Sequence, residues 1–491
     1  MNLKKQFSLN TLIEEGLSRF SVITIELEPD RNAWENPQEI FESMNSLGKP
    51  LTLADLVRNY LLMGLSPEKQ ETLYNSYWLP IERELPGNLS NYIRDFMQLY
   101  SGASYKKATE TNYKELYGIF KNIFQGQTSE AILQALFKYA RFYAWILPNG
   151  QCGQEKVDKQ LADMRILRVT TAYSFLLGLL AKWQDGAFTD RETADILDAF
   201  RIYCTRRRIM SLTSGENKNF PLLVRHLDEL AESTDKRQTM FEVLAHQENN
   251  LRLPNDTEIT NYMQTLNFYN FTYGKFILAL IEEKITKCRP DITDQNTQVE
   301  HIMPQTLNTD WEKELGPNYE AIHQEWVNNI GNLTLIRHNQ ELSNKSFEQK
   351  KDVYENWSGL QIAKTMITNQ DHWNEDTIRA REKWIVDFLL KDVLPIPDDM
   401  RKAHNYVMKR GRGLSFKKLG IIGENIQFIA DPSISVKVVS DKEVEFEGAH
   451  WRMSPLTREI QTRRGVVNAS GAYQGAQYWE YDGVKLADLI D

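Results

Sequence analysis

The residues best suited to chemistry lie between positions 299 and 351. They occur in the segments VEHIMPQTLNTDW and WVNNIGNLTLIRHNQELSNKSFEQKK, in the order Glu300-His301, Pro304, Asn332-Leu333, Asn339 and Asn344. An imidazole titrates near neutral pH and can take a proton from water. Carboxylate and amide oxygens are the donors that hard divalent cations prefer. Together, such groups can activate a water molecule and hold a cation that stabilises developing negative charge.

The order and spacing of these residues resemble the HNH, or ββα-metal, nuclease motif. The resemblance implies that His301 is the general base and that Asn332 holds the hairpin and orients the imidazole. It also implies that Glu300 and one helical amide oxygen bind Mg2+ or Mn2+. The amide comes from Asn344 or Asn339, which differ by about 140° on a regular helix and cannot easily share one metal. The helical continuation SNKSFEQKK favours Asn344 slightly.

A structural interpretation of the same residues competes with the nuclease interpretation. Glu300-His301 can be part of a helix cap, and the three asparagines can be turn residues, as asparagine often is. We favour the nuclease because the whole ordered set is present rather than an isolated Glu-His pair.

Two further segments resemble GmrSD-type modification-dependent restriction enzymes. IFESMNSLGKPLTLADLVRNYLLM is similar to the second half of their nucleotide-dependent, ParB-like domain, and WNEDTIRAREKWIVDFLL, together with the motif above, is similar to their HNH effector domain. The resemblance covers roughly residues 20–395. It implies an enzyme that acts on foreign DNA, including modified DNA, in a bacterial phage-defence or restriction system. The alternative is a non-cleaving sensor of DNA modification, or a regulatory subunit of such a system.

The ParB-like resemblance is incomplete. The Asp-Gly-Gln-Gln-Arg segment of the family does not occur in this sequence, so we expect a separate polypeptide to complete the domain, and NTP binding only if it does. The residues that match the family motif form a candidate nucleotide or inter-subunit site: Asn45, Gly48, Lys49, Asp55, Arg58 and Asn59. Their structural alternative is a capped helix with Asp55 and Arg58 as a surface pair.

Two basic segments are weaker candidates for DNA contact. One is the arginine run that includes Arg207 and Arg208, whose alternative is a solvated face or an intramolecular ion pair. The other is the stretch 401–418, which holds seven Lys or Arg and no acidic residue, including Lys409, Arg410, Arg412, Lys417 and Lys418. It can follow a phosphate backbone or be a charged linker.

The sequence patterns around these residues predict a mainly α, multidomain protein. Apolar residues at helical spacing predict a long helical body, and runs such as LTLI, IQFIA, SVKVV and EVEFEG predict strands. We expect a ParB-like remnant (1–65), a helical domain (66–288), an HNH domain (289–398) and a small α+β domain (399–491). The last resembles domains attached to restriction and methylation proteins, which implies a reader of DNA or its modification. Trp479 in its final strand is a candidate core residue rather than a base-stacking one.

Composition limits the remaining possibilities. The formal charge of −9 argues against a uniformly basic protein that coats nucleic acid, but not against local DNA binding. The three cysteines lack metal-site spacing and fit a reducing, cytoplasmic setting. The longest uncharged run, 169–181, is shorter than the roughly 18 residues of a membrane span, so it predicts a buried helix and no membrane partner. A homo-oligomer is compatible with this organisation.

Overall fold

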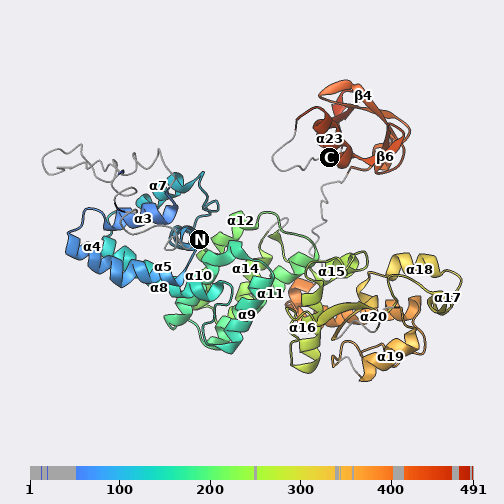
Figure 1. Ribbon diagram of the computed structural model, residues 1–491, viewed down its shortest axis with the longest axis horizontal. Helices are drawn as coiled ribbons and strands as arrows, with labels where there is room; N and C mark the ends of the chain where they lie inside the picture. Colours follow the sequence, from blue (N-terminus) through green and yellow to red (C-terminus); the bar gives the residue numbers. More distant parts are fainter. Residues whose placement is uncertain are drawn as a thin grey trace. The chain divides into compact units, whose positions relative to one another are not determined.

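The chain divides into two compact units, residues 1–403 and 404–491 (Figure 1). The computed structural model describes residues 51–247, 251–337, 342, 344–356, 359–401, 414–466, 475–486 and 489, together with Ile13 and Arg19. The predicted class, mainly α with several modules, is confirmed.

The first part of the larger unit is a helical body, as predicted. It contains α3 (Leu53–Leu62), α4 (Pro67–Leu73), η4 (Tyr74–Trp78), α5 (Leu79–Glu84), α6 (Leu89–Ser101), α7 (Tyr113–Ile123), α8 (Ser129–Ile146), α9 (Glu155–Ile166), η5 (Thr170–Ala172), α10 (Tyr173–Gln184), α11 (Asp190–Ile209), α12 (Glu216–Asn219), η6 (Phe220–His226), α13 (Leu227–Glu232), α14 (Lys236–Ala245), α15 (Asp256–Met263) and α16 (Gly274–Thr286). Helix α10 is almost wholly buried, which confirms the buried helix predicted around residues 169–181. Among the described residues, no helix combines the length and apolar character that crossing a membrane requires.

Local sequence sets where several of these helices begin. Thr52 caps α3 and Thr189 caps α11, each in a capping box with the residue three positions later. Asn255 caps α15 in the same way. Such caps satisfy backbone N–H groups that have no partner within the helix.

The second part of the larger unit is built around a two-stranded antiparallel hairpin. Strands β1 (Thr297–His301) and β2 (Leu333–Arg337) pair in a register that sets His301 opposite Leu333. The elements around them are α17 (Thr309–Leu315), α18 (Tyr319–Trp326), η8 (Ile330–Asn332), α19 (Phe347–Asn356), α20 (Glu375–Phe388), η10 (Leu389–Val393) and α21 (Asp398–Arg401) (Figure 1). The predicted order of strand, strand and helix is therefore present in β1, β2 and α19.

The hydrophobic cores show how this hairpin is joined to the helical body. One core runs from Leu53 to Ile396 and includes Leu333 and Leu335 of β2, while a second lies among residues 302–378. One apolar core thus crosses the predicted boundary at residues 288 and 289. The hairpin is fixed to the helical body by ordinary burial of apolar surface.

The smaller unit has one antiparallel sheet in the order β6-β5-β4-β3-β7-β8. Its elements are α22 (Phe416–Leu419), β3 (Asn425–Phe428), β4 (Asp431–Val438), β5 (Glu443–Phe446), β6 (Ala449–Arg452), α23 (Met453–Arg463), η11 (Gly475–Gln477), β7 (Trp479–Tyr481) and β8 (Val484–Lys485). Trp479 is fully buried and donates its indole N–H to Thr457 Oγ1 at 2.9 Å. It is a core residue, as its apolar character suggested.

Gly331 marks a close approach between η8 and α20. A Cβ added at this position would lie 2.4 Å from the carbonyl oxygen of Ile378, which is backbone and cannot rotate away. Gly331→Ala should therefore lower the free energy of unfolding by about 1–3 kcal/mol, in a urea titration followed by circular dichroism. Gly118→Ala is the control, because nothing lies within 4 Å of a Cβ there and α7 should gain up to about 1 kcal/mol. Equal stability of the two variants would contradict the close packing.

Candidate active site

Glu300 and His301 are the last two residues of β1, so their side chains leave opposite faces of the hairpin. Both residues are mostly buried, at 6% and 7% exposed. Glu300 meets α19, whereas the imidazole of His301 meets the segment before η8 and the loop before α16. The carboxylate and the imidazole are neighbours in sequence but therefore lie on opposite faces at the end of the hairpin.

The imidazole of His301 is held by two contacts. Its Nε2 lies 3.1 Å from Oδ1 of Asn328, and its ring lies 4.3 Å from the Tyr269 ring, centroid to centroid. An amide oxygen can only accept, so this contact places the proton on Nε2 and leaves Nδ1 as the basic nitrogen. Nδ1 has no hydrogen-bond partner within the described residues. It is the atom that can take a proton from water.

The surroundings keep this imidazole neutral. Burial lowers the pKa of His301 below its usual value of 6.5, and the positive charge of Lys350 and the nearby His323 lower it further. The hydrogen bond that His301 donates to Asn328 acts in the opposite direction and raises the pKa. Because burial is the largest of these effects, His301 is a neutral base at pH 7.

Asn332 acts on the loop after His301 rather than on the imidazole. Its Oδ1 accepts from the Met303 backbone N–H at 2.7 Å and from the Trp373 indole N–H at 3.0 Å. Its Nδ2 donates to the carbonyls of Met303 and Val327, at 2.9 and 3.0 Å. All these bonds are made inside the protein, since Asn332 is fully buried. Among the described residues, Asn328 makes the contact with the imidazole that was predicted for Asn332.

Lys350 of α19 binds the carboxylate predicted to be a metal ligand. Its ammonium donates to Glu300 Oε1 and to the His301 carbonyl, both at 2.7 Å, and the side chain is fully buried. Burial lowers the pKa of Lys350, and the carboxylate of Glu300 opposes that shift. Sequence reasoning did not assign this residue. A signal was present, because Phe347, Lys350 and Tyr354 have helical spacing and share the buried face of α19.

The structure describes only one of the two candidate amide ligands. Asn339 lies outside the described residues. Asn344 is exposed, and its backbone carbonyl accepts from Asn308 Nδ2 at 2.7 Å. The predicted choice between Asn339 and Asn344 stays open.

The donor set can be compared with what different metals require. No group of three or more His, Cys, Asp or Glu side chains able to hold a metal occurs within the described residues. A closed zinc site usually has four Cys or His ligands, and the described residues do not provide such a group. Mg2+ is usually bound through one or two carboxylates, water and substrate phosphate. Glu300 with one amide is a set of that kind, although Lys350 already neutralises the carboxylate.

The arginine run at the end of α11 is internal. Arg207 is fully buried and Arg208 is 6% exposed, and both bind the carboxylate of Glu216. Neither guanidinium is presented to solvent, so the structure does not support the prediction that these residues contact DNA. The alternative of an intramolecular ion pair describes them correctly.

The structure describes only some of the remaining candidate residues. Asp55 completes the cap of α3 and pairs with Arg58 at 3.2 Å, as the structural alternative expected. Lys417 is exposed on α22, and its backbone N–H donates to Asp441. Outside the described residues or side chains lie Asn45, Gly48, Lys49, Lys409, Arg410, Arg412 and Lys418.

The hairpin thus ends in a buried carboxylate and a neutral imidazole, and α19 follows it. Residues 253–388 match the family model of the C-terminal domain of GmrSD restriction endonucleases. This stretch contains Glu300, His301, Asn328, Asn332 and Lys350. This match supports the GmrSD-type resemblance over residues 253–388. No curated protein matches the chain.

The pair of Lys350 and Glu300 can be tested through stability. Lys350→Met leaves Glu300 buried without its ammonium partner, so the free energy of unfolding should fall by about 3–5 kcal/mol in urea titrations. Combining it with Glu300→Gln should recover part of this loss, since the buried negative charge is then absent. Lys351→Met is the control, because Lys351 binds the Gln370 carbonyl and should lose much less. Additive losses in the double variant would contradict the coupling.

Proposed function

We propose that this protein is a metal-dependent HNH endonuclease that hydrolyses phosphodiester bonds of foreign DNA in a phage-defence or restriction system. The observation that carries the proposal is the neutral His301 at the end of a hairpin that is followed by α19, within a stretch that matches restriction endonucleases. The proposal also includes action on modified DNA, a partner polypeptide that would allow NTP binding, and assembly as a homo-oligomer.

The residues of this chain have distinct roles in the reaction. His301 Nδ1 accepts a proton from the attacking water, while Asn328 holds the ring through Nε2. Asn332 fixes the loop that follows His301. Lys350 holds the Glu300 carboxylate and the His301 carbonyl in place.

The metal belongs on the Glu300 side of the hairpin. Glu300 and the amide of Asn339 or Asn344 would hold Mg2+ or Mn2+, which would stabilise negative charge on the phosphate and the leaving oxygen. Few protein ligands would hold the metal, so we expect EDTA to remove it. Cleavage should then stop, and added Mg2+ should restore it.

Replacing His301 tests the base. His301→Ala should lower the rate of plasmid nicking in Mg2+ by about 10²- to 10⁴-fold, because the proton acceptor is lost. His372→Ala is the matched control, since that side chain is 73% exposed in the same part of the chain and should leave the rate unchanged. Circular dichroism melting checks that both variants fold.

One outcome would reject the role of His301, and another would reject the nuclease. Unchanged nicking by His301→Ala would remove His301 from the reaction. DNA binding by the unaltered protein, without cleavage under any metal or nucleotide, would instead favour the non-cleaving sensor of DNA modification. The separate β-rich unit, residues 404–491, is the observation that keeps this second function under test.

The pH profile tests the protonation state of the imidazole. His301 must be neutral to act, so kcat/KM should be level above pH 6.5 and fall tenfold per pH unit below the lowered pKa of His301. Asn328→Ala removes a bond that favours the protonated ring, so the acid limb should move to lower pH and the maximal rate should fall. Asn356→Ala, which removes a contact with Asp352 within α19, should leave the profile unchanged. An acid limb centred above pH 6.5 would contradict this assignment.

A further inference from the structure

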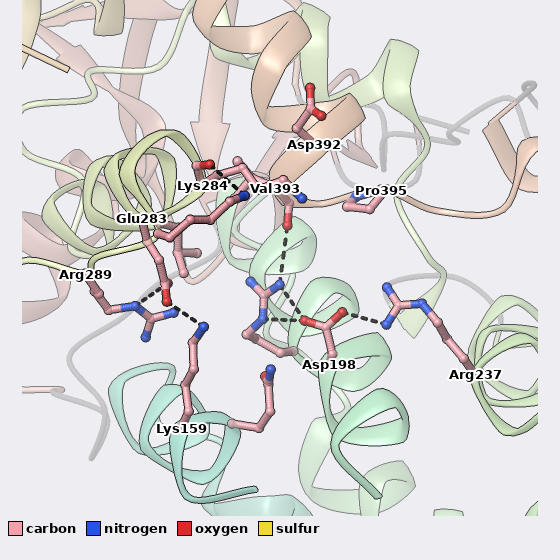
Figure 2. Close-up of a pocket in the computed structure, with 13 residues that line it drawn as sticks. Lys159, Asp198, Arg237, Glu283, Lys284, Arg289, Asp392, Val393 and Pro395 are labelled. Carbon is pink, nitrogen blue, oxygen red and sulfur yellow. Dashed lines mark hydrogen bonds and ion pairs between the residues drawn. The ribbon is translucent and has the colours of Figure 1, made fainter. Parts of the chain in front are cut away.

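A polar cavity of about 390 Å³ lies in the larger unit, away from the candidate active site (Figure 2). We call it the junction cavity, because α9, α11 and α14 of the helical body line it together with α16 and η10. Its lining residues are Lys159, Gln160, Asp198, Arg201, Arg237, Leu280, Glu283, Lys284, Lys287, Arg289, Asp392, Val393 and Pro395. The catalytic candidates of the hairpin are not among them. The volume is within the range of small-molecule sites, at the low end.

Positive charge exceeds negative charge in this lining. Six lining residues are cationic and three are carboxylates, a formal balance of +3. Asp163, fully buried and bound by Arg201 and Arg289, reduces the balance to +2.

Each of two carboxylates is shared between two cations. Asp198 accepts from Arg201 at 2.7 Å and from Arg237 at 2.6 Å (Figure 2). Glu283 is bound at 2.5 Å by Lys159 and at 2.6 Å by Arg289. These ion pairs hold four cationic side chains from different elements around the cavity. The two carboxylates balance only part of the positive charge of the four cations.

Arg201 contributes a fixed, mostly buried guanidinium to the cavity lining. The residue is only 6% exposed, and its Nη1 is buried with no hydrogen-bond partner within the described part of the chain. Its Nε and Nη2 are used by Asp198 and the Val393 carbonyl. Asp198 and the Val393 carbonyl therefore hold the guanidinium in the cavity lining, where its positive charge attracts an anion.

Helix electrostatics explain only part of the arrangement. Lys284 lies in the last turn of α16 and Lys287 caps it, where cations are favourable without any ligand. Neither ammonium has a carboxylate partner among the residues described. The helix end does not account for the cations contributed by α9, α11 and α14.

We propose that the junction cavity binds a small anion bearing one or more phosphate groups. Arginine forks and lysine ammonium groups converging from several elements are the usual means of binding phosphate. A divalent cation is disfavoured because six cationic side chains line the cavity against three carboxylates, and two of these carboxylates, Asp198 and Glu283, are each bound by two of the cations. A ligand here would connect the helical body to α16 and η10 and so stabilise the larger unit.

Calorimetric titration of the full chain with pyrophosphate and with ADP tests the site. EDTA is included so that a metal cannot mediate binding. The unaltered protein should bind at least one of these probes, and its melting temperature should rise with probe concentration. The double variant Lys284→Gln/Lys287→Gln should bind roughly tenfold more weakly, because it removes the two ammonium groups that have no carboxylate partner.

The control variant removes the same charge elsewhere. Lys114→Gln/Lys218→Gln alters two exposed lysines of the helical body that do not line the cavity, and it should bind the probe as the unaltered protein does. Melting without probe checks that both double variants are folded. The proposal is overturned if neither probe binds, or if both double variants bind equally well. It is also overturned if only a 20-base-pair DNA duplex binds and the Lys284/Lys287 variant weakens that binding, since the lysines would then belong to a DNA surface.

Discussion

The geometry of the candidate active site depends on one buried charge, the guanidinium of Arg381 on α20. Arg381 is fully buried and donates to the carbonyls of Gly331 and Leu333 at 2.9 and 2.8 Å, with longer contacts to residues 330, 362 and 365. Burial lowers the pKa of Arg381 to about 9, so the group stays charged at neutral pH. A charge removed from water must be surrounded by dipoles, and here the backbone of η8 and β2 supplies them. This requirement holds α20 against the start of β2.

The same turn then determines the surroundings of His301. Glu382, next to Arg381, binds the amide of Asn329 at 2.7 Å, and Gly331 allows η8 to lie directly against α20. Asn328 and Asn332 flank this anchored turn and reach back to residues 301–303. The imidazole is therefore positioned by a helix that does not touch it. Its environment is set through the backbone of a short loop.

Several charged side chains of this protein lie inside the fold. The chain has a net charge of −9, yet Arg206, Arg207 and Arg381 are fully buried and bind carboxylates or carbonyl groups. A run of arginines in the sequence was consequently a poor guide to a DNA-binding surface. The junction cavity differs from these internal sites, because its cations outnumber the carboxylates that line it.

The sequence by itself determined the elements and the order of the site. Apolar spacing and capping residues predicted the helical body, β2 and the strands of the smaller unit, because these features are local. The motif identified Glu300, His301 and Asn332, and the family match of residues 253–388 confirms the GmrSD-type resemblance. The nuclease roles of these residues remain predictions.

Only the tertiary structure decided which partners these residues have. Lys350 is 50 residues from Glu300 along the chain, and Asn328 is 27 residues from His301. Trp373 and Arg381 reach the hairpin turn from still later segments. Local sequence patterns could not predict that Arg207 and Arg208 are buried. They also could not predict that five elements assemble the junction cavity. The physical reason is that burial and pairing of charge depend on which distant segments pack together, whereas helix and strand patterns depend on residues a few positions apart.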